Sequence, residues 1–184
     1  MISLLLATLA TAAPAAAIDP CSLLDPKAIA AVQGAPPKNT KASEHPDGAL
    51  ISRQCFFTLP NFVQSVSFEV TTPNAGAKAK ALRERWDQLS GKERERGEQD
   101  GERGKRARGG EEEEAGRPPR PVHGVGRAAV WVGSARAGAL YVLAPAAILR
   151  VSVGGAADES AKIKSCSALA KNALQRLARL TKRG

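Results

Sequence analysis

The sequence predicts an α+β fold, in which helices cover one face of an antiparallel sheet of about five strands. Residues 62–72 alternate between apolar and polar side chains, as a strand with one buried face does. Short turns separate the strand candidates, which favours antiparallel pairing. Apolar residues recur at helical spacing within 74–90 and again after Ser160. The expected order is helix, two strands, helix, insert, three strands, helix. Strict strand–helix alternation is missing, so a doubly wound fold is disfavoured.

The chain has 184 residues, which is enough for one domain and is short for two domains. Hydrophobic residues make up 43% and aromatic residues only 4%, so Ala, Val, Leu and Ile must build the core. We expect a signal peptide (1–17), the first half of a single domain (18–91), a disordered charged insert (92–121) and the second half (122–184). After residue 17 no apolar run is long enough to span a bilayer.

Residues 1–17 have the features of an export signal. They contain no charged side chain, and an apolar run leads to three alanines that end at Ala17, a favourable site for signal peptidase. The usual basic start is missing, and only the amino terminus is positive there. A lipid anchor on Cys21 is the alternative, but Pro20 directly before the cysteine fits a lipobox poorly. We therefore expect a soluble periplasmic or extracellular product rather than a lipid-anchored one.

The first half should open with a short helix. Asp25 is followed by proline, a favourable helix start, and Gly34 ends the helix. The polar stretch that continues to Gly48 is predicted to be a loop. Strands at 52–59 and 62–72 follow.

A helix is predicted over 74–90, with Asn74 as its cap and Trp86 on its apolar side. The next segment, 92–120, contains nine basic and nine acidic residues and almost no apolar ones. Such a segment cannot bury enough surface to offset its ordering entropy, so we expect disorder. A polyampholyte arm that contacts a partner is the alternative.

The second half should contain three strands and a closing helix. Strands are predicted at 128–132, 139–143 and 147–153, separated by glycine and proline breaks. Ser160 is the predicted cap of the last helix, and Cys166 lies on the apolar side of that helix.

The last helix is the most polarised part of the chain, because seven basic residues and no acidic residue occur from Ala161 onward. Its basic residues form the candidate contact with an anionic surface: Lys162, Lys164, Lys171, Arg176, Arg179, Lys182 and Arg183. The alternative is an ordinary solvated helix face, with cations favoured near the C-terminal end of the helix dipole. Specific nucleic-acid binding is not predicted, because no recognition motif accompanies the charge.

No pattern of catalytic, metal-binding or cofactor-binding residues emerges. The two histidines, His45 and His123, lie in predicted loops without an obvious orienting carboxylate. Metal ligands at characteristic spacing are missing. The Gly124 and Gly126 pair lacks the third glycine of a dinucleotide fingerprint, and a strand follows it, which indicates a turn.

Several short elements resemble a known pattern. Residues 19–26 read D-P-C-S-L-L-D-P and precede a glycine, and Cys55 lies beside an aromatic residue on a strand. A G-V-G-R-A-A element begins at Gly124, and K-I-K at 162–164 lies in the last helix. These elements resemble small exported bacterial proteins of unknown function that open with D-P-C-x-L-L. The resemblance implies an exported, often envelope-associated domain, and it supplies no catalytic residue.

Three cysteines permit three different single disulfides. The resemblance implies the pair Cys21–Cys55, because these two occupy the paired positions of the pattern; the competing pair is Cys21–Cys166. A Cys21–Cys55 bond would close a loop of roughly 35 residues and stabilise the fold by about 3–4 kcal/mol. Cys166 would then be a small buried residue.

The expected function is that of a non-catalytic binding or envelope-associated accessory protein. Its expected partner is an anionic envelope surface or another envelope protein, with no cofactor. The alternatives are a thiol- or histidine-dependent envelope enzyme and a purely structural protein. An exposed thiol with a low pKa would favour the enzyme, and a buried or bonded cysteine would not.

Overall fold

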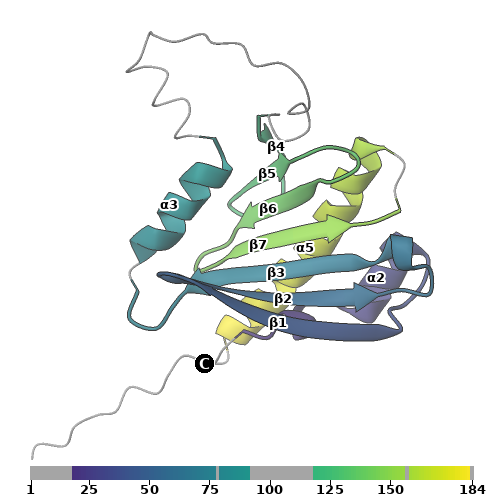
Figure 1. Ribbon diagram of the computed structural model, residues 1–184, viewed down its shortest axis with the longest axis horizontal. Helices are drawn as coiled ribbons and strands as arrows, with labels where there is room; N and C mark the ends of the chain where they lie inside the picture. The colour runs from purple at the N-terminus through teal and green to yellow at the C-terminus, as the bar shows by residue number, and fades with distance from the viewer. Residues whose placement is uncertain (1–17, 78, 92–117, 156–157, 183–184) are drawn as a thin grey trace, which may run out of the picture.

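The computed structural model describes residues 18–77, 79–91, 118–155 and 158–182 (Figure 1). The predicted signal peptide and most of the predicted insert, residues 92–117, lie outside these ranges. The described residues form an α+β fold with four α-helices and a seven-stranded antiparallel sheet. The predicted fold class is therefore confirmed, whereas the expectation of about five strands is wrong.

The strands are β1 (Asn39–Asp47), β2 (Leu50–Thr58), β3 (Val66–Pro73), β4 (Arg120–Pro121), β5 (Ala128–Val132), β6 (Ala139–Leu143) and β7 (Ile148–Val153). The helices are α1 (Pro20–Leu23), α2 (Pro26–Gln33), α3 (Ala79–Leu89) and α5 (Glu159–Thr181), and η1 (Phe62–Gln64) is a short 3-10 helix. The spatial order of the strands is β1-β2-β3-β7-β6-β5-β4. Two meanders, β1–β3 and β4–β7, therefore lie side by side and join where β3 pairs with β7.

The main core lies between the sheet and the helices α1, α2 and α5 (Figure 1). Phe68 and Val151 are direct neighbours across the β3–β7 junction, and neither side chain is exposed. Leu140 on β6 and Leu169 on α5 are equally buried against them. The long helix α5 thus packs across the junction of the two meanders and holds them together.

Helix α3 lies on the opposite face of the sheet, so the expectation that all helices share one face is wrong. Leu82 and Trp86 of α3 are buried in a second, smaller cluster with Leu50, Val130 and Ile148. Ile148 of this second cluster is followed in β7 by Leu149 of the main core. Because successive strand residues point to opposite faces, the two clusters lie on opposite sides of the sheet. The predicted core position of Trp86 is confirmed, but it belongs to this second cluster.

Strand β1 corrects the predicted loop before Gly48. Almost every residue of β1 is exposed, so the strand has no buried face and shows no apolar alternation. It is held by backbone pairing with β2 over its whole length, from Asn39 opposite Thr58 to Asp47 opposite Leu50. Gly48 forms the connecting turn with a φ of +57°, a conformation that glycine adopts without strain.

Several element boundaries also differ from the predictions. Residues 120–121, assigned to the insert, pair with β5 as β4. The stretch 62–64 forms η1, so β3 begins only at Val66. Asp158, not Ser160, caps α5, because its carboxylate accepts a hydrogen bond from the backbone N–H of Ala161.

Other boundaries are confirmed. Helix α2 is capped by Asp25 and ends at Gly34, which has a φ of +82°. Strands β5, β6 and β7 lie where the sequence places them, to within one residue. Asn74, however, forms a turn with Ala77, and α3 begins only at Ala79.

Candidate functional site

The basic residues of α5 lie on different sides of the helix. The inward side carries buried Cys166, Leu169, Ala170, Ala173 and Leu177, which pack on the sheet and on α1 and α2. The remaining helix surface faces away from the core. Whether each basic side chain can contact an external surface therefore depends on its position around the helix axis.

Lys162 does not belong to the outer surface. Its side chain is buried, with only 6% of the residue exposed, and its Nζ donates a hydrogen bond to the backbone oxygen of Arg136 at 3.3 Å. Lys162 precedes Cys166 by one helical turn, so both lie on the side that faces the sheet. We therefore remove Lys162 from the candidate contact residues.

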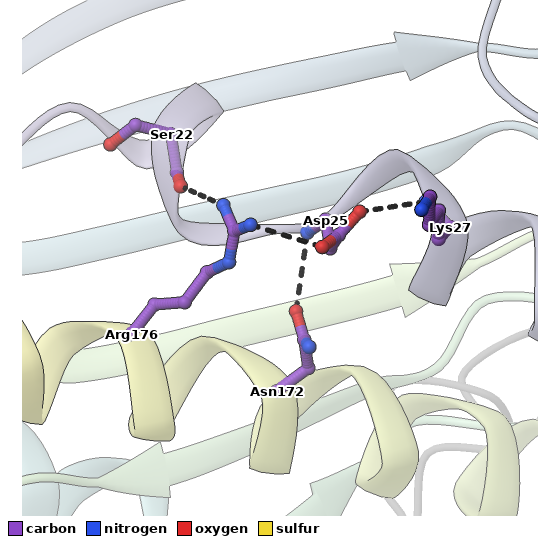
Figure 2. A network of polar contacts seen from close by, with 5 residues as sticks. All are labelled: Ser22, Asp25, Lys27, Asn172 and Arg176. Carbon is purple, nitrogen blue, oxygen red and sulfur yellow. Dashed lines mark hydrogen bonds and ion pairs between the residues drawn. The ribbon is translucent and has the colours of Figure 1, made fainter.

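Arg176 ties α5 to the start of the domain (Figure 2). Its guanidinium donates to the backbone oxygen of Ser22 at 2.8 Å and to Oδ2 of Asp25 at 3.0 Å. One turn earlier in α5, Oδ1 of Asn172 accepts a hydrogen bond from the backbone N–H of Asp25 at 3.2 Å. The other carboxylate oxygen of Asp25 caps α2 by accepting from the N–H of Lys27.

This network gives Arg176 a structural role. The charge of its guanidinium faces the carboxylate of Asp25, and both side chains are about one-third exposed. A partly exposed ion pair of this kind contributes at most about 1 kcal/mol, but its geometry fixes how α5 sits against the α1–α2 junction. Arg176 is therefore less available to an external anion than the sequence predicts.

Lys164 and Lys171 in α5 form one stripe along its outer side with Lys182, the C-cap residue of the helix. They are separated by seven and eleven residues, and 18 residues are five turns of an ideal helix. All three are exposed, and within the described ranges none forms an ion pair. We call these three lysines the lysine stripe.

Arg179 extends this positive region near the end of the helix. It is exposed, and together with Ser22, Arg176 and Leu180 it lines an open hollow of about 260 Å³. Arg183, the last candidate contact residue, lies outside the described residues. The candidate site thus consists of the lysine stripe and Arg179, and Lys162 and Arg176 lie apart from it.

The predicted disulfide is confirmed. Cys21 in α1 is bonded to Cys55 in β2, with their Cα atoms 5.1 Å apart, so the competing Cys21–Cys166 pair is wrong. The bond fixes α1 to the sheet beside the core. A disulfide is expected where the compartment is oxidising, and it fits an exported protein.

Cys166 lacks the properties of a reactive thiol. Its side chain has no exposed surface, and burial raises the pKa of the thiol from 9.0 to about 12. His45 is exposed on the edge strand β1, and His123 is exposed in the turn before β5. The three residues lie on different elements.

The described residues offer neither a metal-binding cluster nor a membrane-spanning helix. Over 18–77, 79–91, 118–155 and 158–182, no three His, Cys, Asp or Glu side chains come together in a way that could bind a metal ion. Within the same ranges, no helix has the length and apolar character needed to cross a membrane.

Comparisons with known proteins do not assign this chain to a family. No protein-family model matches the chain, and no curated protein or solved structure is significantly similar to it. The resemblance to exported proteins with a D-P-C-x-L-L opening stays a prediction.

Proposed function

We propose that this chain is an exported accessory protein that binds an anionic surface of the cell envelope through the lysine stripe of α5 and does not catalyse a reaction. The observation that supports this most is the alignment of Lys164, Lys171 and Lys182 on one exposed side of a helix. Their ammonium groups are not neutralised by any described carboxylate. The disulfide supports the exported compartment.

The expected strength of binding is modest. A lysine near an anionic membrane contributes about 1 kcal/mol, and this attraction falls off within a Debye length of about 10 Å at 0.1 M salt. Three lysines and Arg179 therefore support reversible binding that weakens steeply as salt increases. A helix face that is merely solvated would show no such attraction.

The test compares two variants that lose the same charge from different helices. Lys164→Gln/Lys171→Gln removes two charges from the lysine stripe, and Lys80→Gln/Arg83→Gln removes two exposed charges from α3. Binding to vesicles with anionic phospholipid and to a soluble phosphate-rich polymer is measured between low and high salt. We expect the α5 variant to bind at least one of these surfaces about tenfold to thirtyfold more weakly, and the α3 variant to stay within about twofold of the wild type.

The proposal would be overturned by either of two results. Equal weakening of both variants would show that only the net charge matters. Failure of the unmodified protein to bind either anionic surface at low salt would remove the anionic partner altogether.

A further inference from the structure

The turn between β2 and β3 exposes two large apolar side chains. Phe62 is 69% exposed and Val63 is 67% exposed, whereas the next most exposed large apolar residue in the described ranges, Leu180, is at 49%. The ring of Phe56 on β2 lies behind Phe62, with 6.0 Å between the ring centroids. We call Phe62 and Val63, backed by Phe56, the apolar tip.

The chain around the apolar tip is held by internal hydrogen bonds. Asn61 accepts from the N–H of Val63 through its side chain at 3.2 Å, and from the N–H of Gln64 through its backbone oxygen at 2.9 Å. The backbone oxygen of Phe62 accepts from the N–H of Ser65 at 3.0 Å. These contacts form η1 and fix the directions in which Phe62 and Val63 point.

Two distant segments brace the same turn. The side-chain amide of Gln33 at the end of α2 donates to the backbone oxygens of Gln64 at 2.5 Å and of Gly154 at 3.1 Å. Gly154 packs so closely that a Cβ at this position would lie 1.8 Å from the backbone oxygen of Val63. The apolar tip is therefore presented by a preorganised turn, so binding costs little loop-ordering entropy.

The backbone of this turn is suited to an apolar environment. Unpaired N–H and C=O groups are costly to move into lipid. Here the N–H groups of Val63, Gln64 and Ser65 are bonded, as are the backbone oxygens of Phe62 and Gln64. Pro60, which precedes η1, has no N–H to satisfy. These bonds lower the cost of placing this part of the turn in an apolar layer.

Positive charge lies next to the apolar tip. Lys38 continues the backbone pairing of β1 with β2, and Lys41 lies directly opposite Phe56 in the β1–β2 register. Both lysines are exposed. The turn also lies at the end of the sheet from which β7 leads into α5 (Figure 1).

The chemistry favours a lipid bilayer over a protein partner. Protein interfaces are depleted in lysine and bury about 800 Å² on each side, whereas the apolar tip exposes only two large apolar residues and has lysines on the neighbouring strand segment. Aromatic and aliphatic side chains beside lysines are typical of segments that lie in the headgroup region of a membrane.

We propose that the apolar tip inserts Phe62 and Val63 into the interface of a bilayer that contains anionic phospholipid, while Lys38 and Lys41 contact its headgroups. This inference rests on the proposed function, which supplies the anionic surface, and it specifies that this surface is a phospholipid bilayer. It depends on residues distinct from the lysine stripe.

The test uses the purified protein and vesicles of phosphatidylcholine with phosphatidylglycerol at low salt. Phe62→Ser/Val63→Ser is expected to weaken vesicle binding about tenfold, because apolar burial is lost. Its melting temperature should stay unchanged, since both side chains are exposed. Leu180→Ser removes an exposed apolar side chain from the last turn of α5 and leaves every lysine and Arg179 in place, so it is the matched control and should bind within about twofold of the wild type.

A spectroscopic measurement shows insertion directly. Phe62→Trp should shift its fluorescence emission to the blue when these vesicles are added, and brominated lipids should quench it. The native Trp86 and Trp131 are 4% and 1% exposed, so they should respond little.

Three outcomes would overturn insertion and leave the proposed function standing. In the first, Phe62→Ser/Val63→Ser binds vesicles like the wild type while Lys164→Gln/Lys171→Gln does not. In the second, the protein binds the phosphate-rich polymer but not vesicles. A third result, in which Phe62→Trp shows no shift and no quenching, would have the same meaning. Failure to bind either surface would overturn both.

Discussion

The two faces of the sheet are formed by the same strands but bury different amounts of apolar surface. The face under α1, α2 and α5 is apolar from β2 to β5 and includes Phe68, Leu149 and Val151, all fully buried. On the opposite face, the buried apolar residues of the described ranges gather under α3, and Phe56 lies apart from them beside Phe62. The rest of that face carries a ladder of polar side chains.

The polar ladder is held by cross-strand hydrogen bonds. The side-chain amide of Gln54 donates to Oγ of Ser67 at 2.7 Å, and the hydroxyls of Ser52 and Thr71 lie 2.9 Å apart. Because these groups also reach solvent, each bond contributes little to stability. The sheet therefore buries most of its apolar surface on one face, and the other face is expected to contribute less to stability.

The largest contrast should come from two neighbours in β7. Leu149→Ala opens a cavity in the main core and should lower the free energy of unfolding by about 3–4 kcal/mol. Ile148→Ala acts on the smaller cluster under α3, which can shift toward the gap, and should cost about 2 kcal/mol. Denaturant unfolding of both variants measures this difference. Equal costs would show that the two faces contribute alike.

A smaller and more local effect is expected at α3. Trp86→Ala removes the main contact of α3 with the sheet and should lower the free energy of unfolding by about 2 kcal/mol. This loss cannot exceed the free energy that is needed to detach α3 while the rest of the protein stays folded. Hydrogen exchange should therefore become faster in residues 79–89 and stay unchanged in β3 and β7. Faster exchange throughout the sheet would mean that α3 and the main core unfold together.

An effect that is absent at neutral pH and develops only in alkali concerns the buried thiol on the covered face. Burial raises the pKa of Cys166 to about 12 in the folded chain, against 9.0 for the free thiol. Above pH 9 the unfolded chain releases this proton and the folded chain keeps it, so stability falls as pH rises from about 9 toward about 12. The slope is at most about 1.4 kcal/mol per pH unit.

Cys166→Ala provides the control for this pH dependence. The difference in unfolding free energy between the wild type and Cys166→Ala should be constant below pH 9 and should decrease above it. Subtracting the variant cancels every pH effect that the two proteins share. A difference that stays constant up to pH 11 would contradict the burial of the thiol.

Local patterns explain which parts of the fold could be predicted. The strands β5, β6 and β7 were predictable because their apolar residues and glycine breaks are local signals. Strand β1 was not, because it buries no face and exists only through its pairing with β2. The apolar stripe of α3 shows which side of the helix is buried, but it does not show which face of the sheet that side meets.

The candidate site was predictable to a similar degree. The spacing of Lys164, Lys171 and Lys182 places them on one helix side, and the position of Lys162 one turn before Cys166 would have indicated an inward direction. The ion pair of Arg176 with Asp25 could not be predicted, because it joins residues from the two ends of the chain. The apolar tip could not be predicted from the alternation of the strand, because the adjacent apolar residues Phe62 and Val63 interrupt that pattern before Val66.

The junction of β3 with β7 has a consequence for how the chain acquires its structure during synthesis. Val66 pairs with Val153, so β3 emerges with an unpaired edge that is completed only after most of the remaining chain has followed. Cys21 and Cys55 both precede β3, so their bond can form during this interval. An early cross-link would hold β2 against α1 and leave the nascent β3 fewer ways to pair with a neighbouring polypeptide.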